Sequence, residues 1–465
     1  MSGLGMMSET PVPPAARMPM KLSDALKQAQ ALFAKGQIDQ AERFAAAIVA
    51  KRPQHVMANQ LLAAIAEKRG QRERTVEILQ RCLTGASTDA LPLMNLCRAY
   101  RLLGRLEESR AAGERAVALG NLPDAHVDLA DTFTAMSEHA AAREHYERAV
   151  ARRPHLARGR LGLAQALLQA GDFGPGWLEY EWRYKMPTAE NVLPKFKQPQ
   201  WNGMALKSSR LLVIAEQGYG DCFQFARYLP LVCERVKEVF IGTGPEISAI
   251  LKAAAPQALC FERWEQIPSF DFQITMSSLP FAFGTTLETI PRRSPYLFAD
   301  PAKTAAWRTR LQAAGQGRRT VGFVWQGRPT HPNDRLRSLD LAFLAPLFNL
   351  EGWLPVSLQM GTAREQLQRR AQAAQIFDAA AHITDFSDTA ALIQNLDAVV
   401  TIDSAVAHLT GGLAKRGFVM LPRAAEWRWL IERSDSPWYP TLELVRQDAE
   451  GWPGVVRRIV ERLRA

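Results

Sequence analysis

Residues that could bind phosphate and move a proton gather near the C-terminal end of the chain, within residues 397–415. The stretch 398–402 is apolar and β-branched, which predicts a strand buried on both faces of a parallel sheet. Asp403 and Ser404 interrupt this pattern, and the apolar residues that follow have helical spacing. Either residue could cap a helix whose free N–H groups and positive dipole end favour a phosphate. An alternative is that Asp403 is an ordinary N-cap and His408 a hydrogen-bonded core histidine.

A second candidate loop, residues 216–221, follows an apolar stretch at 211–215. Gly218 and Gly220 would let its backbone turn closely against a ligand. Asp221 stands where a helix begins, so its carboxylate could accept a proton from a substrate hydroxyl or simply cap that helix. The glycine patterns of dinucleotide-binding folds and of the P-loop are both absent.

A third loop, residues 326–338, is rich in arginine. Beginning at Gln326, it contains Arg328, Arg335 and Arg337 together with a histidine. Arginine can hold a diphosphate through two hydrogen bonds at once, so this composition suits such a ligand. A solvated surface loop is the competing interpretation, and the position of the loop after the predicted strand at 321–325 argues against it.

These loops belong to a region in which short apolar strands alternate with helices, from residue 210 onward. The predicted strands lie at 211–215, 238–242, 272–276, 321–325, 354–359, 398–402 and 417–421. Such alternation predicts parallel sheets with helices on both faces. A predicted helix over 300–319 divides the strands into two groups, so we expect two doubly wound domains facing across a cleft. Ligands of such domains bind beyond the carboxyl ends of the strands.

The N-terminal third contains a repeated junction between amphipathic helices, with a period of about 34 residues. It occurs around Gly36, Gly70 and Gly104, and in weaker form around Ser137 and Gly171. This arrangement resembles the tetratricopeptide repeat (TPR), whose stacked helix pairs form a superhelix with a concave groove. Such grooves usually hold protein segments, although the array could also only support the rest of the chain. An aromatic-rich stretch, 174–184, predicts a capping helix that packs on the following domain.

The composition limits the remaining possibilities. The 465 residues suggest two or three domains, and the five scattered cysteines favour a reducing cytoplasm over a disulfide framework or a zinc site. The formal charge of +10 comes from basic residues interleaved with acidic ones, so nucleic acid is not an expected partner. No stretch of 18 apolar residues predicts membrane insertion, and residues 1–20 read as a disordered leader.

Three segments, 216–228, 321–337 and 401–409, together resemble the TPR-containing relatives of the lipopolysaccharide heptosyltransferases, and residues 426–440 add to the match. The resemblance covers nearly the whole chain. It implies a TPR superhelix followed by a GT-B fold of two Rossmann-like α/β domains. The order of repeats and transferase domain is also similar to protein O-glycosyltransferases, among them bacterial flagellin glycosyltransferases.

The resemblance implies a role for individual residues. Asp221 matches the general base of an inverting transfer. Asp403, Ser404 and His408 match the motif that holds the donor's nucleotide diphosphate, and Arg335 and Arg337 are placed where a basic residue would neutralise the leaving phosphate. The predicted donor-binding residues also include Gly218, Gly220 and Gln326. No metal or other cofactor is expected, because positive charge and helix dipoles would stabilise the leaving nucleotide. Arg328 and Glu426 depart from the family pattern, so the sugar is not predicted.

The predicted domains are a leader (1–20), a TPR array with its capping helix (21–190), a linker (191–209), an acceptor-side domain (210–315) and a donor domain (316–465). The predicted function is transfer of a sugar from a nucleotide sugar to a Ser or Thr hydroxyl of a protein held by the repeats, with flagellin as one candidate. The alternatives are a glycan or lipid-linked acceptor, and an inactive TPR scaffold.

Overall fold

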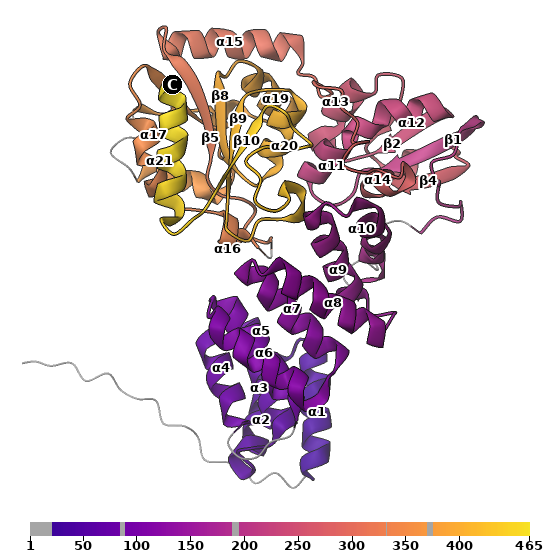
Figure 1. The fold of residues 1–465 in the computed structure, drawn as a ribbon, viewed down its shortest axis with the longest axis vertical. Coiled ribbons are helices and arrows are strands. Elements are labelled where there is room, and N and C mark those ends of the chain that lie inside the picture. The colour runs from indigo at the N-terminus through magenta and orange to yellow at the C-terminus, as the bar shows by residue number, and fades with distance from the viewer. Residues whose placement is uncertain (1–20, 84–88, 188–194, 332, 370–374) are drawn as a thin grey trace, which may run out of the picture. The chain divides into compact units, whose positions relative to one another are not determined.

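The computed structural model describes residues 21–83, 89–187, 195–331, 333–369 and 375–465, so the predicted leader lies outside the described residues. The chain forms two compact units, residues 1–159 and residues 160–465 (Figure 1). Each unit has hydrophobic clusters of its own: one large cluster runs from Ala164 to Leu463, and smaller ones lie among the repeats. The finer domain bounds stay predictions.

The first unit is an array of paired helices of the TPR kind, as the sequence predicts. Its helices are α1 (Leu22–Ala34), α2 (Ile38–Lys51), α3 (Val56–Lys68), α4 (Arg72–Arg81), α5 (Ala90–Leu103), α6 (Leu106–Gly120), α7 (Pro123–Met136) and α8 (His139–Arg152). The turn within each of the first three pairs contains a glycine with φ near +75°: 76° at Gly36, 74° at Gly70 and 77° at Gly104. Left-handed backbone of this kind favours glycine, which explains the repeated junction.

The second unit contains two parallel sheets, and this confirms the predicted α/β architecture. The first sheet has the order β3-β2-β1-β4, and the second has the order β10-β9-β8-β5-β6-β7. The strands are β1 (Leu206–Ile214), β2 (Val236–Gly242), β3 (Leu259–Phe261), β4 (Phe272–Thr275), β5 (Arg319–Val324), β6 (Trp353–Ser357), β7 (Phe377–Asp378), β8 (Ala398–Ile402), β9 (Gly417–Leu421) and β10 (Leu442–Arg446). All seven predicted strands are present. The three that were not predicted, β3, β7 and β10, lie at sheet edges.

Helices connect these strands and cover the sheets (Figure 1). In the first α/β domain they are α11 (Tyr219–Phe225), α12 (Leu229–Arg235), α13 (Pro245–Ala254) and α14 (Leu279–Ala282); α15 (Pro301–Gly315) then leads to the second domain. In the second domain they are α16 (Asp334–Arg337), α17 (Ala345–Phe348), α18 (Glu365–Gln368), α19 (Phe386–Gln394), α20 (Ala405–Gly412) and α21 (Gly451–Arg464). Within the described residues, no helix combines the length and the apolar character needed to cross a membrane.

The predicted capping helix is α10 (Phe173–Tyr180), and it packs on both α/β domains. Its Trp177 is 1% exposed. The indole ring lies 6.3 Å from the ring of Phe225 in the first domain and 5.4 Å from that of Trp427 in the second. The preceding helix, α9 (Ala157–Ala170), contributes a hydrogen bond of 2.8 Å from Gln169 Nε2 to the carbonyl oxygen of Ala425. The last helical hairpin is therefore part of the core of the second unit.

Substituting Trp177 by alanine is expected to lower the free energy of unfolding by about 3–5 kcal/mol, because it leaves a large cavity among aromatic rings. It also removes the hydrogen bond of 3.1 Å from Trp177 Nε1 to the carbonyl oxygen of Thr285. The neighbouring Leu178 is 57% exposed, so Leu178→Ala is a matched control expected to cost less than about 0.5 kcal/mol. Urea unfolding followed by circular dichroism measures both, and equal losses would contradict the packing role of Trp177.

Candidate functional site

The carboxyl ends of the two parallel sheets meet where α11 packs directly against α20. A Cβ atom added at Gly220 would lie only 2.7 Å from His408 Cδ2 and 3.5 Å from the Cα of Ala405. The first domain therefore touches the second through a glycine, and a larger residue would force them apart. This close approach places the loop before α11, the residues after β8 and the segment 426–429 around one cluster of polar side chains.

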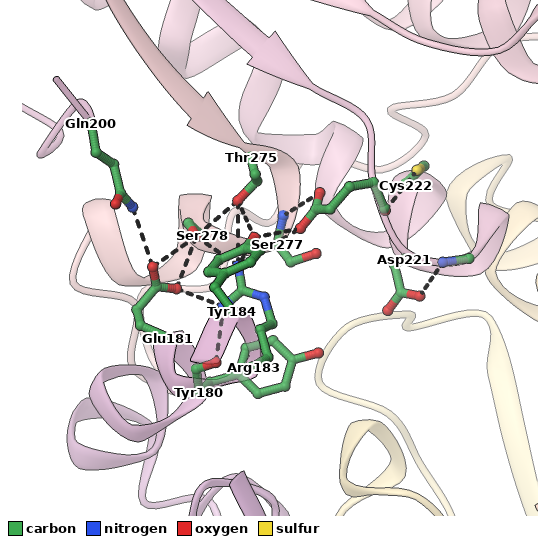
Figure 2. A network of polar contacts seen from close by, with 12 residues as sticks. Tyr180, Glu181, Arg183, Tyr184, Gln200, Asp221, Cys222, Thr275, Ser277 and Ser278 are labelled. Atoms are coloured by element: carbon green, nitrogen blue, oxygen red, sulfur yellow. Dashed lines mark hydrogen bonds and ion pairs between the residues drawn. The ribbon is translucent and has the colours of Figure 1, made fainter. Parts of the chain in front are cut away.

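Asp221 occupies the first turn of α11, and both of its carboxylate oxygens have partners. Oδ2 accepts a hydrogen bond of 3.0 Å from the backbone N–H of Gly218 (Figure 2), and Oδ1 forms an ion pair with Arg428. Gly218, and not Asp221, is therefore the N-cap residue of α11, and Asp221 at the third helical position bonds back to its N–H, as in a capping box. The second contact ties Asp221 to the other α/β domain.

Arg428 is the residue at this site that sequence reasoning did not assign. Its side chain is 9% exposed and forms ion pairs with Asp221 and with Glu426. Its guanidinium carbon also lies 4.2 Å above the ring of Trp427. The stretch around Trp427 stands out in the sequence only through the family resemblance, because nothing in the local sequence places Arg428 beside a carboxylate 207 positions earlier.

Asp403 is buried, and this burial raises its pKa to about 6, with the nearby Glu426 carboxylate adding to the shift. The guanidinium groups of Arg337 and Arg428 act in the opposite direction. Arg337 Nη1 also donates a hydrogen bond of 2.9 Å to the backbone carbonyl oxygen of Asp403. The Arg-rich loop therefore reaches the residues after β8 through Arg337.

His408 lies at the centre of the cluster. Burial, together with the charge of Arg428, holds its pKa well below the ordinary value, so the imidazole is neutral at pH 7. Its Nδ1 lies 2.8 Å from the Tyr439 hydroxyl, its Nε2 lies 3.9 Å from Asp403 Oδ1, and its ring stacks on Trp429 with centroids 5.3 Å apart. These contacts fit both interpretations of His408, as a core residue and as part of a donor site.

One buried hydrogen-bond donor of the cluster is unsatisfied. Within the described residues, Arg337 Nε has no hydrogen-bond partner, although it lies 3.6 Å from Asp334 in an ion pair. The Trp429 side chain, in contrast, is directed at the Asp403 carboxylate and acts to lower its pKa. Buried donors without acceptors are costly, and a ligand rich in acceptor oxygens would satisfy them. The site is therefore suited to an anionic ligand such as a phosphate ester.

The remaining predicted residues lie around this cluster in different settings. Ser404 is the N-cap residue of α20, but its side chain makes no capping hydrogen bond; its Oγ lies 3.1 Å from Thr401 Oγ1. Gln326 stabilises its own loop, since its Nε2 donates to the carbonyl oxygen of Leu339 at 3.4 Å. Arg335 is exposed on α16. Among the described residues, no group of three or more His, Cys, Asp or Glu side chains is placed to hold a metal ion.

A buried polar network anchors the loop that leads to Asp221 (Figure 2). Glu216, at the start of this loop, accepts a hydrogen bond of 2.8 Å from the Tyr184 hydroxyl and lies 3.7 Å from the Arg183 guanidinium. Arg183 in turn donates to Ser278 Oγ at 2.6 Å, beyond the end of β4. Burial raises the pKa of Glu216 against the influence of Arg183. Arg183 and Tyr184, which follow α10, therefore hold the loop 216–221 in place through Glu216.

Comparisons with known proteins extend over different parts of the chain. No model of a known protein family matches it. The chain is 27% identical over 447 residues to Protein FlbA of Caulobacter vibrioides, which covers 88% of this chain and 72% of that relative. Among solved structures, the TPR protein TTC0263 of Thermus thermophilus is 19% identical with a TM-score of 0.32, covering 36% of this chain and 92% of its own. PilW, a type IV pilus biogenesis factor, is 17% identical with a TM-score of 0.34, covering 37% and 81%.

The raised pKa of Asp403 predicts a pH-dependent effect of Asp403→Asn on stability. Between about pH 4 and 6 the folded state holds a proton that the unfolded state has released, so the wild type loses stability as the pH rises. The asparagine variant has no carboxyl to ionise. The difference in free energy of unfolding, variant minus wild type, is therefore expected to rise by about 2 kcal/mol as the pH is raised from about 4 to 6. Urea unfolding at a series of pH values measures this difference.

Asp388→Asn is a control, because the pKa of Asp388 is shifted in the direction opposite to that of Asp403. Although burial opposes the shift, hydrogen bonds from Thr384 and Lys303 hold the pKa of Asp388 below its ordinary value. This carboxylate therefore contributes stability above its unfolded pKa, and the contribution is lost as the pH falls. The Asp388 variant is expected to lose stability relative to the wild type as the pH rises. A pH-independent difference for Asp403→Asn would contradict the raised pKa.

Proposed function

We propose that the chain is an inverting glycosyltransferase of the GT-B type that acts without a metal ion. It moves a sugar from a nucleotide-sugar donor to a Ser or Thr hydroxyl of a protein in the cytoplasm, and flagellin is one candidate acceptor. The observation that carries this proposal is the buried cluster in which Arg337, whose Nε has no hydrogen-bond partner among the described residues, and Arg428 lie at the start of α20, with the carboxylate of Asp221 beside them.

The arrangement supports a division of roles between the two α/β domains. Asp221, from the first domain, would accept the proton of the acceptor hydroxyl as its oxygen attacks the anomeric carbon of the sugar. The bond from that carbon to the phosphate oxygen breaks, and its electron pair leaves with the nucleoside diphosphate. Arg337 and the start of α20, from the second domain, would stabilise the negative charge that develops there.

The first unit supports a protein acceptor over a carbohydrate one. Its paired helices form a TPR-type array with a core of its own, in which small residues such as Ala41, Ala45 and Ala116 are fully buried. Arrays of this kind present extended surfaces to protein segments. A glycan acceptor would not need such a surface, so we assign recruitment of the acceptor to residues 21–156.

One observation favours an inactive scaffold as the second candidate. Both oxygens of Asp221 are engaged, by Arg428 and by the N–H of Gly218, and an oxygen paired with a guanidinium is not free to accept a hydroxyl proton. A chain that never releases this pair would bind a partner without modifying it. Activity measurements on the base variant separate the two candidates.

Asp221→Asn is expected to reduce sugar transfer by about 10²–10⁴-fold, because the general base is lost, without weakening nucleotide binding. Transfer is measured by intact mass of the acceptor, and binding by calorimetry with nucleoside diphosphates. Asp271→Asn is a suitable control, since Asp271 pairs with Arg210 at a half-exposed position outside the cluster. Transfer by the Asp221 variant at the wild-type rate would remove Asp221 from the base role.

Removing residues 1–156 is expected to abolish modification of the protein acceptor while leaving slow hydrolysis of the donor intact. This cut keeps α9 whole and so preserves the hydrogen bond from Gln169 to the loop before Glu426. A chain lacking only residues 1–20 is the control and is expected to retain both activities. Undiminished modification by the shorter chain would show that the repeats do not recruit the acceptor.

A further inference from the structure

Arg428 lies between the carboxylates of Asp221 and Glu426, next to the cluster proposed to bind the donor. Its Nη2 pairs with Asp221 of the first α/β domain, and its Nη1 pairs with Glu426 of its own loop. Its charge also reaches the groups after β8, because it acts to lower the pKa of both Asp403 and His408. The same guanidinium therefore acts on the candidate base and on the candidate phosphate site.

The surroundings of Arg428 combine a fixed backbone with a long side chain. Trp427, the residue before it, packs against Trp177 at 5.4 Å and against Tyr180 at 5.8 Å between ring centroids. The segment cannot shift as a whole without breaking these contacts. The arginine head group, in contrast, can turn about its flexible stem and exchange one oxyanion partner for another, since the planar fork fits carboxylate and phosphate alike.

We propose that Arg428 binds the donor's diphosphate and leaves Asp221 in order to do so. This inference rests on the proposed function and adds to it a residue and an order of events. Without a diphosphate, the Arg428 guanidinium is paired with Oδ1 of Asp221. When a diphosphate enters the cluster, the guanidinium moves to its oxygens, and Oδ1 becomes able to accept the proton of the acceptor hydroxyl. Donor binding thereby switches the base on.

This arrangement explains the engaged state of Asp221 without requiring an inactive enzyme. The carboxylate is held in position by the N–H of Gly218 throughout, while its other oxygen passes from a cation to a substrate proton. The phosphate gains Arg428 in addition to Arg337, whose Nε lacks a hydrogen-bond partner among the described residues. Acceptor chemistry then starts only on a chain that already holds its donor.

The test is calorimetric binding of inorganic pyrophosphate to the full chain and its variants. Arg428→Met is expected to weaken binding by about 10–100-fold, as loss of charge-assisted hydrogen bonds predicts. Arg428→Lys keeps the positive charge but lacks the planar guanidinium. Its affinity for pyrophosphate is expected to lie between those of the wild type and Arg428→Met. Asp221→Asn is expected to tighten binding by about 3–10-fold, because Arg428 no longer has to leave a carboxylate. Arg210→Met removes the half-exposed ion pair with Asp271 and is the control. It is expected to leave the affinity for pyrophosphate unchanged.

The double variant Asp221→Asn/Arg428→Met separates this mechanism from simple removal of negative charge. If Asp221 acts by retaining Arg428, the double variant binds pyrophosphate no more tightly than Arg428→Met alone. Tightening in both backgrounds, or unchanged affinity in Arg428→Met and Arg428→Lys, overturns the proposal and leaves the proposed function standing. If neither pyrophosphate nor any nucleoside diphosphate binds the wild type, the proposed function itself is wrong.

Discussion

The ion pair between Asp221 and Arg428 joins the two α/β domains at their carboxyl ends, and the rest of the site is arranged around it. Taking two charges out of water is unfavourable unless further polar contacts compensate. Here Glu426 shares the guanidinium and the N–H of Gly218 shares the carboxylate. Each charge therefore keeps one partner when the pair opens, and while the pair is closed it links the α11 and 426–429 segments.

The aromatic residues of α10 give this ion pair its low-dielectric setting. Trp177 contacts Phe225 and Trp427, and these lie in different α/β domains. Tyr180, one turn later, is buried beside Arg428 and Asp221, and burial raises its pKa to about 12. A helix that the sequence assigns to the end of the repeats therefore acts as a third wall of the site, which strengthens the electrostatic interactions inside it.

Much of this fold is predictable from sequence because buried strands are nearly continuous apolar runs, as β5 and β8 are. The edge strands β3 and β7 have three and two residues, too few for a periodic signal, and β10 mixes Glu443 and Arg446 with apolar positions. At the site, Asp221, Asp403 and Arg337 are predictable because loops after parallel strands share one edge. Arg428 is not, because its role depends on a carboxylate from the other domain, and such tertiary pairs leave no local pattern.

The position of the boundary between the compact units, inside α9, has a consequence for recombination between related genes. Upstream of α9, repeats stack mainly on their neighbours, so whole helix pairs can be gained, lost or exchanged without disturbing the α/β core. Downstream of that boundary, α9 and α10 are bound to the loop containing Ala425 and Trp427. We expect the repeats before α9 to diverge in number and surface as an interchangeable unit, whereas the last hairpin is inherited together with the two α/β domains.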